Sequence, residues 1–141
     1  MFFGEYQYKV DEKGRLPLPP KFRRDMKAVA VLTRGSEKCV AVYPEAEWKR
    51  LADSLAARTV TSANLRKLNR AIFGAAFSAS FDKQGRITLP FPLRQYAGIC
   101  DTVVVVGANQ YVELWNEDAW KQERAAAEEQ ATQIMESLGS S

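Results

Sequence analysis

Two stretches decide the fold of this chain: DEKGRLPLPPKFR at residues 11–23 and DKQGRITLPFPLR at residues 82–94. They lie 71 residues apart, and six of their thirteen positions are identical. The identical pairs are Asp11 and Asp82, Gly14 and Gly85, Arg15 and Arg86, Leu18 and Leu89, Pro19 and Pro90, and Arg23 and Arg94. Self-similarity at a fixed offset indicates that one structural unit occurs twice.

The similarity continues on both sides of these stretches, so the two copies span residues 5–47 and 76–119. After one extra residue in the second copy, the offset is expected to become 72, which aligns Trp48 with Trp120. We interpret the two ranges as half-motifs of one unit. Residues 120–141, rich in Ala and Glu, are expected to form an acidic C-terminal helix and tail.

Each copy predicts the same order of elements. Asp can bond its own backbone two residues on and Gly accepts a positive φ, so Asp-x-x-Gly predicts a turn joining a hairpin. Prolines end the second strand of that hairpin and suit the first turn of a short helix. The expected ranges are 5–10, 15–18, 20–26, 28–34 and 39–43 in the first copy and 86–89, 91–97, 102–106 and 111–115 in the second.

The remaining segments predict helices, and together the elements predict an α+β fold that is mainly β. One helix is expected from Pro44, one over 63–73 with Ser62 as its N-cap, and one through 121–138. Four short strands bury too little to be stable alone, so the two copies are expected to complement each other. We expect a pseudo-two-fold β-barrel that closes its own edges, with an inter-repeat helix and a C-terminal helix.

The composition argues against an enzyme. The chain has no histidine, which excludes Ser–His–Asp and Cys–His catalysis and every zinc site that needs imidazole. Cys39 and Cys100 form no CxxC pair, and the phosphate-loop, dinucleotide and nucleophile-elbow motifs are absent. We therefore expect no catalytic residue, no metal, no cofactor and no small-molecule substrate.

The sequence also predicts a cytoplasmic chain without membrane contact. No apolar run approaches the ~20 residues that span a bilayer. The first residues, MFFGE, lack the basic and apolar regions of a signal peptide.

The charge is unevenly distributed along the chain. Residues 1–100 carry 18 Lys and Arg against 9 Asp and Glu, whereas residues 101–141 carry 2 against 8. The basic body favours a polyanion as partner. The acidic end either competes with that polyanion for the basic surface or is a solvated helix face.

The duplicated turn, Asp-x-x-Gly-Arg, is the motif that carries a chemical hypothesis. In one interpretation it is a turn with a local ion pair, which needs no ligand. In the other, the Asp orients an Arg whose planar guanidinium binds a phosphate or a guanine edge. The candidate DNA-contacting residues are Lys13, Arg15, Lys83 and Arg86, supported by Asp11, Gly14, Asp82 and Gly85.

Other residues receive structural interpretations. Asp11 and Asp82 are a weak candidate for a glycosidase-like carboxylate pair, because each has a cation nearby and no cleft is indicated. Arg23 and Arg94 are explained by a salt bridge or by contact with the C-terminus of a short helix. The aromatic residues at strand-to-helix corners are expected to pack in the core.

The chain resembles the MraZ family over about residues 1–124. The resemblance rests on the MF-x-GEY start, the KGRLPLPPKFR run, the second-copy GRITLP-x-x-LRQYAG run, and the YP-x-x-EW and ELW-x-x-x-W segments. It implies the AbrB/SpoVT-like swapped-hairpin fold. It also implies that the family's D-x-x-x-R motif lies at Asp11–Arg15 and Asp82–Arg86.

The resemblance further implies a bacterial transcription regulator that binds short repeated promoter sites in double-stranded DNA, upstream of the division and cell-wall gene cluster. It implies a ring-shaped homo-oligomer in the cytoplasm, associated with the nucleoid. Transcriptional repressor and activator remain open. Gln84 stands where the first copy has Lys13, so the second turn is expected to bind phosphate less strongly. The alternative is an AbrB-like protein-interaction module of the antitoxin type.

Overall fold

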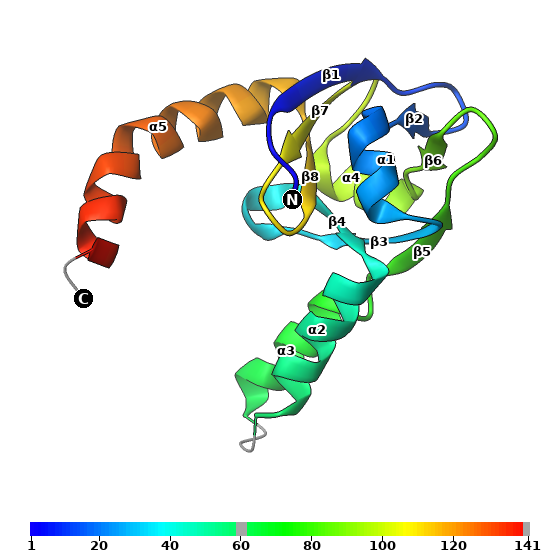
Figure 1. Ribbon diagram of the computed structural model, residues 1–141. Helices are drawn as coiled ribbons and strands as arrows, with labels where there is room; N and C mark the ends of the chain where they lie inside the picture. Colours follow the sequence, from blue (N-terminus) through cyan, green and yellow to red (C-terminus); the bar gives the residue numbers. More distant parts are fainter. Residues whose placement is uncertain (59–61, 140–141) are drawn as a thin grey trace.

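The computed structural model describes residues 1–58 and 62–139, which form an α+β fold (Figure 1). The strands are β1 (Glu5–Lys9), β2 (Arg15–Pro17), β3 (Val29–Arg34), β4 (Val40–Pro44), β5 (Phe77–Ser80), β6 (Arg86–Thr88), β7 (Thr102–Gly107) and β8 (Val112–Trp115). The α-helices are α1 (Pro20–Met26), α2 (Glu45–Ala56), α3 (Ala63–Ile72), α4 (Phe91–Ala97) and α5 (Glu117–Gly139). These elements confirm the predicted α+β class and the long C-terminal helix; residues 140–141 of the expected tail lie outside the described residues.

The larger sheet relates the two copies by a pseudo-two-fold axis. Its antiparallel strands run in the order β1-β7-β8-β4-β3-β5, and exchanging equivalent strands of the two copies gives the same order read from the other edge. At its centre, Ala41 of β4 lies opposite Glu113 of β8. In the separate pair of β2 and β6, Leu16 lies opposite Ile87. Both pairs join equivalent residues, so the axis passes through both.

The hairpin expected within each copy is wrong, because the second strand pairs with the other copy. β1 pairs with β7 and β5 with β3, while β2 pairs with β6. The turn itself forms as predicted. Pairing β2 with β6 turns both Leu16 and Ile87 into the core, where each is at most 1% exposed. A local pattern cannot distinguish this exchange from a hairpin, because both satisfy the same alternation.

The expected closed barrel is also wrong for the described residues. The six-stranded sheet is open, with β1 and β5 at its edges. β2 and β6 are three residues long and form their own two-stranded sheet. Pro19 and Pro90, which follow these strands, lead directly into α1 and α4, so neither strand extends far enough to close the sheet.

The alignment of the two copies needs one correction. Lys9 pairs with Thr102, and Ser80, which is 71 residues after Lys9, pairs with Val29. Val29 and Thr102 are therefore equivalent, although 73 residues separate them. The second copy has two extra residues between its short helix and its third strand, where Gly98 ends α4 with φ 65°. The expected offset of 72 is right for the fourth strand and wrong for the third.

One cluster of buried side chains joins the large sheet, the β2–β6 pair and the two short helices. Phe22 of α1 and Leu93 of α4 occupy equivalent places and are each 1% exposed. Burying a side chain of this size stabilises the fold by about 1.5–3 kcal/mol relative to leaving it in water. Because both copies contribute to this core, neither can bury its own apolar face alone.

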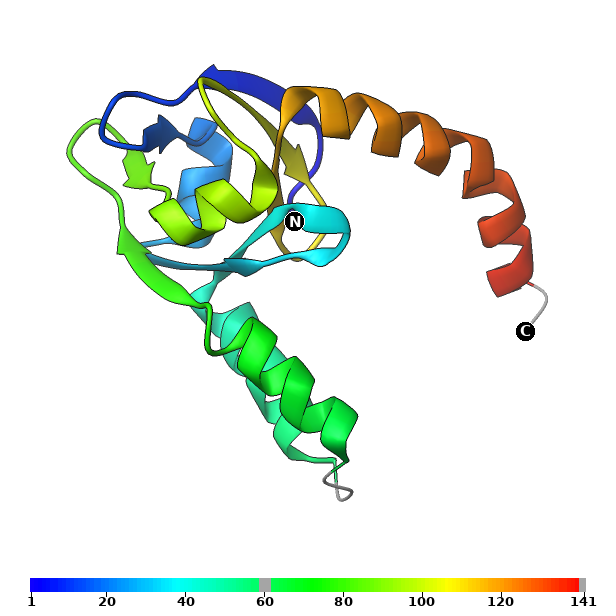
Figure 2. The ribbon, with the colours of Figure 1, turned by 180° about the vertical axis from the view of Figure 1, so that it is seen from behind.

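Two helical parts project from this body (Figures 1 and 2). α2 and α3 lie side by side as a hairpin, and Ser62 caps α3 as predicted, its Oγ accepting a hydrogen bond from the Leu65 N–H at 3.1 Å. α5 leaves the body on the side opposite the β2 and β6 turns. Within the described part of the chain, no helix is both long and apolar enough to span a membrane.

The corner aromatics pack against one another, but of the four only Trp115 is buried in the core as expected, and Tyr43, Trp48 and Trp120 are half-buried. Trp115 is 2% exposed and its ring lies 5.5 Å from that of Trp120. The Trp48 ring lies 5.7 Å from Tyr43 and 4.8 Å from Phe73, so it joins α2 to the end of α3.

Candidate nucleic-acid interface

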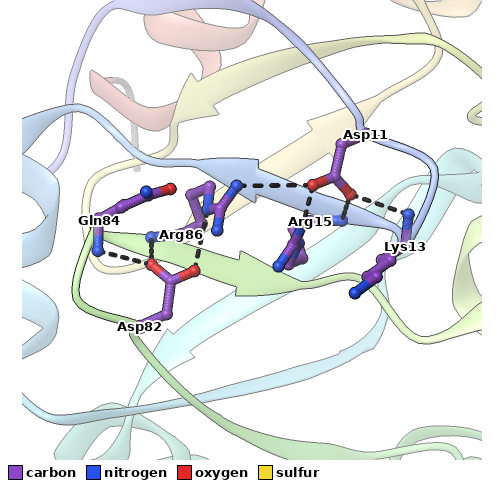
Figure 3. A network of polar contacts seen from close by, with 6 residues as sticks. All are labelled: Asp11, Lys13, Arg15, Asp82, Gln84 and Arg86. Atoms are coloured by element: carbon purple, nitrogen blue, oxygen red, sulfur yellow. Dashed lines mark hydrogen bonds and ion pairs between the residues drawn. The ribbon is translucent and has the colours of Figure 1, made fainter.

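The two duplicated turns lie side by side because β2 pairs with β6 (Figure 3). Along each strand alternate residues face opposite sides, and Leu16 and Ile87 face the core. Arg15 and Arg86 therefore face outward, each one residue from its buried neighbour. The fold thus brings the predicted Asp-Arg motifs of both copies onto one surface.

In the first turn, Asp11 fixes both the backbone and the arginine. Its Oδ1 accepts hydrogen bonds from the backbone N–H groups of Lys13 at 3.0 Å and Arg15 at 2.8 Å. Its Oδ2 accepts one from Arg15 Nε at 2.7 Å. The Gly14 N–H closes the turn on the Asp11 carbonyl at 3.0 Å, with φ 78° at Gly14. One carboxylate therefore shapes the loop and aims the guanidinium.

The second turn repeats these bonds. Asp82 Oδ1 accepts from the N–H groups of Gln84 at 2.9 Å and Arg86 at 2.8 Å, and its Oδ2 from Arg86 Nε at 2.9 Å. Gly85, at φ 76°, donates its N–H to the Asp82 carbonyl at 3.0 Å. Both interpretations of the motif fit this geometry: each aspartate accepts a hydrogen bond from the Nε of its own arginine, and the Nη groups lie outside that bond.

A contact across the strands links the turns. Arg86 Nη1 lies 3.6 Å from Asp11 Oδ2, so Asp11 faces both arginines. The side chains of Arg15 and Arg86 are 32% and 27% exposed. Figure 3 shows both arginines lying over the paired strands, between Asp82 and Asp11. The result is a fixed, partly exposed pair of planar cations.

The surroundings of both carboxylates favour their charged form. Backbone hydrogen bonding, first from Arg15, lowers the pKa of Asp11 below its ordinary value of 3.8. The Arg86 N–H does the same for the pKa of Asp82. A general acid needs the opposite shift, so the pair is poorly suited to acid–base catalysis. The carboxylates instead remain negative and hold the arginines.

The eight residues predicted for the site fall into one group. The two aspartates, two glycines and two arginines form the paired turns, and Lys13 and Lys83 are exposed on the same loops. In Figure 3, Lys13 lies at the Asp11 end of the network, where its backbone N–H donates to that carboxylate. The lysines therefore add exposed positive charge beside the arginine pair.

The sequence interpretation missed a role for Arg23. Its guanidinium packs on Gly85 of the other copy's turn instead of forming a helix-end contact. Arg94 binds the loop just after α4 and not the end of the helix itself, since its Nε donates to the Ile99 carbonyl at 3.0 Å. The available signal was that both arginines recur at the same offset as the turn.

Neither cysteine belongs to this surface. Burial raises the pKa of the Cys39 thiol well above its ordinary value. Among the described residues, no three His, Cys, Asp or Glu side chains cluster so as to hold a metal ion.

The acidic C-terminal helix lies away from the turns. Arg124 Nη1 of α5 pairs with Glu5 Oε1 of β1 at 2.6 Å, and Gln7 Nε2 donates to Glu117 Oε2 at 3.3 Å. Beyond these contacts α5 extends from the opposite side of the body (Figure 2). The described part of the tail therefore does not cover the turns of its own chain.

Comparison with known proteins adds a family to this geometry. A family model described as "MraZ protein, putative antitoxin-like" matches twice, at residues 1–71 and 72–138. A transcriptional regulator MraZ of Dehalococcoides mccartyi is 51% identical over 98% of both chains. A transcriptional regulator MraZ of Halothermothrix orenii is 42% identical over 99% of both chains. One of Frankia alni is 41% identical over 98% of this chain and 96% of its own length. This chain belongs to the MraZ family.

Proposed function

We propose that the chain is a transcriptional regulator that binds double-stranded DNA through its two Asp-Arg turns. The observation that carries this proposal is the pairing of β2 with β6, which sets two carboxylate-oriented arginines side by side on one outward surface. Membership of a family of transcriptional regulators makes the chain a regulator and not an enzyme.

The chemistry of the turns suits DNA. A guanidinium held at its Nε still presents its other N–H groups, whose planar arrangement matches two phosphate oxygens or the O6 and N7 atoms of guanine. Lys13 and Lys83 supply phosphate contacts that position the protein without reading sequence. Arg15 and Arg86 are therefore the candidates for base contact.

The finer proposal follows the family resemblance. It assigns short promoter repeats upstream of the division and cell-wall gene cluster as the target, in the cytoplasm at the nucleoid, and a ring-shaped homo-oligomer as the binding form. One pair of turns makes few phosphate contacts, so a single subunit should bind weakly. Several linked subunits gain from effective concentration when the DNA offers several repeats.

A salt-titrated binding assay on repeat-bearing and scrambled DNA tests this function, with mass in solution measured alongside. Arg15→Ala and Arg86→Ala should weaken binding and flatten its salt dependence, because fewer counterions are released. Lys49→Ala on α2 removes the same charge from an exposed position away from the turns and is the matched control. Unchanged binding by folded turn variants would contradict the proposal.

A protein-interaction role of the antitoxin type is the second candidate. One observation favours it: Ile134 and Met135, near the end of α5, are 53% and 70% exposed. Such side chains suit a helix that docks in a partner's groove. A stoichiometric protein captured from nuclease-treated extract, and lost on removal of α5 beyond Arg124, would support this role.

A further inference from the structure

The short helices reach across the pseudo-two-fold axis to the turns. α1 belongs to the first copy, yet its Arg23 packs on Gly85 in the turn of the second copy. α4 belongs to the second copy, and its Arg94 lies beside Gly14 in the turn of the first. Both arginines recur at the offset of the turns themselves. Each turn is thus supported by a cation from the opposite copy.

Arg23 makes the tighter of the two contacts. A Cβ placed on Gly85 would lie 2.9 Å from Arg23 Cδ and nearer still to the guanidinium, so a larger residue there would displace Arg23. Gly85 is itself buried and closes the turn that holds Asp82 and Arg86. The Arg23 side chain therefore packs against the backbone of the second turn at Gly85.

Arg94 is held more firmly but touches its turn more lightly. Its Nε and Nη2 donate to the carbonyls of Ile99 and Cys100 at 3.0 and 2.6 Å. A Cβ on Gly14 would lie 3.8 Å from Arg94 Nη1, an ordinary contact distance. The Leu89 N–H, in the segment before α4, also donates to the Gly14 carbonyl at 2.8 Å. The second copy thus holds the first turn by the Leu89–Gly14 hydrogen bond and by the contact of Arg94 with Gly14.

The different lengths of the two loops explain the difference in anchoring. The carbonyls that hold Arg94 belong to residues 99 and 100, in the stretch where the second copy is two residues longer. The shorter loop of the first copy has no such stretch. Arg23 Nε is buried without a hydrogen-bond partner among the described residues. Its charge instead faces Tyr8 of β1, where it opposes the rise in pKa that burial causes.

We propose that Arg23 and Arg94 are positioning residues, each holding the DNA-contacting turn of the opposite copy. The inference rests on the proposed function, because it assigns these residues a part in aiming Arg86 and Arg15. Removing the Arg23 side chain would remove its packing against Gly85, so the second turn would be less firmly held. Removing that of Arg94 would release the loop that fixes the first turn.

Crossed double-mutant cycles on the full-length chain test this proposal, with repeat-bearing DNA as the probe. Arg15→Ala should weaken binding by about tenfold in the wild-type background and by less than about threefold in Arg94→Gln. In Arg23→Gln it should still cost about tenfold. For Arg86→Ala we expect the reverse: its loss of DNA affinity should be smaller in the Arg23→Gln background and unchanged in the Arg94→Gln background. Lys49→Ala should leave every loss unchanged.

The pattern of coupling separates positioning from other roles. Additive losses in all pairs would mean that the arginines contact DNA themselves or act through overall stability, and would overturn the proposal. Coupling of each arginine to the turn of its own copy would overturn it too. If Arg15→Ala and Arg86→Ala have no effect alone, the proposed function fails instead. Should the glutamine variants not fold, Arg23→Lys and Arg94→Lys, which keep the aliphatic stem, take their place in the cycles.

Discussion

The turn at residues 11–15 carries Lys13 at its third position, whereas the turn at residues 82–86 carries Gln84. The bonds inside the turns nevertheless match: each aspartate accepts the same two N–H groups, and its Oδ2 lies 2.7 or 2.9 Å from the arginine Nε. The two copies therefore share the aspartate hydrogen bonds that orient the arginine, whereas the charge of the neighbouring residues differs. The two turns form a natural experiment within one chain.

The largest expected effect is the loss of DNA binding on removal of the aimed arginines. Arg15→Ala should weaken binding about fivefold to a hundredfold, the cost of losing a two-pronged contact. Arg86→Ala should cost less, because Arg86 also lies near Asp11, whose carboxylate offsets part of its charge. Binding titrations at one fixed salt concentration give both numbers. A larger loss for Arg86→Ala would reverse the ranking of the turns.

Alanine at the two glycines should distinguish the turns by stability. Both positions have a positive φ, which costs an L-residue about 1–3 kcal/mol. Gly85→Ala should destabilise the chain more than Gly14→Ala, since its Cβ would overlap Arg23, whereas at Gly14 the nearest atom is the Leu89 carbonyl oxygen at 3.1 Å. Urea unfolding of both variants measures the difference. Equal losses would show that Arg23 moves aside without cost.

A second lysine in the second turn, beside Lys83, should strengthen DNA binding modestly. Gln84→Lys copies Lys13 of the first turn and adds one phosphate contact, which should raise affinity a few-fold and steepen the salt slope by about one unit. The reciprocal change, Lys13→Gln, should have the opposite effect. Parallel salt titrations of the two variants check the symmetry. An unchanged slope in Gln84→Lys would mean that the second turn does not approach phosphate.

The smallest expected effect is on the stability of the fold at acidic pH. Asp11 and Asp82 have pKa values below 3.8 in the folded state, so their contribution to stability is complete above that ordinary value and is lost as pH falls through the lowered ones. Asp11→Asn and Asp82→Asn should each reduce the dependence of unfolding on pH in that acidic window. Thermal unfolding from pH 6 down to pH 2 provides the comparison. Identical curves for wild type and variants would contradict the assigned hydrogen bonds.

The sequence predicted the local elements and the two Asp-Arg turns, because both depend on short-range chemistry. The Asp-x-x-Gly-Arg pattern determines a turn and an ion pair wherever it occurs, and alternation around Leu16 and Ile87 determines which side faces inward. The recurrence of the pattern at one offset then indicated that two such turns exist. All of this information lies within a few neighbouring residues.

Pairing between distant strands was beyond such patterns. Leu16 is buried equally well opposite its own copy or opposite Ile87, so the exchange of partners leaves no local trace. The sheet stays open because Pro19 and Pro90 direct the chain into α1 and α4, and local sequence patterns did not predict the open sheet. The role of Arg23 depends on contact across the axis, 62 residues away at Gly85, and only its recurrence as Arg94 hinted at it.

Amide hydrogen exchange with and without repeat-bearing DNA tests the central claim most directly, because it reports on every element of the same molecule. The account predicts that DNA slows exchange in both turns, at residues 12–15 and 83–86, and leaves the projecting α2–α3 hairpin and α5 unchanged. Protection confined to α2, α3 or α5, with both turns unaffected, would contradict it.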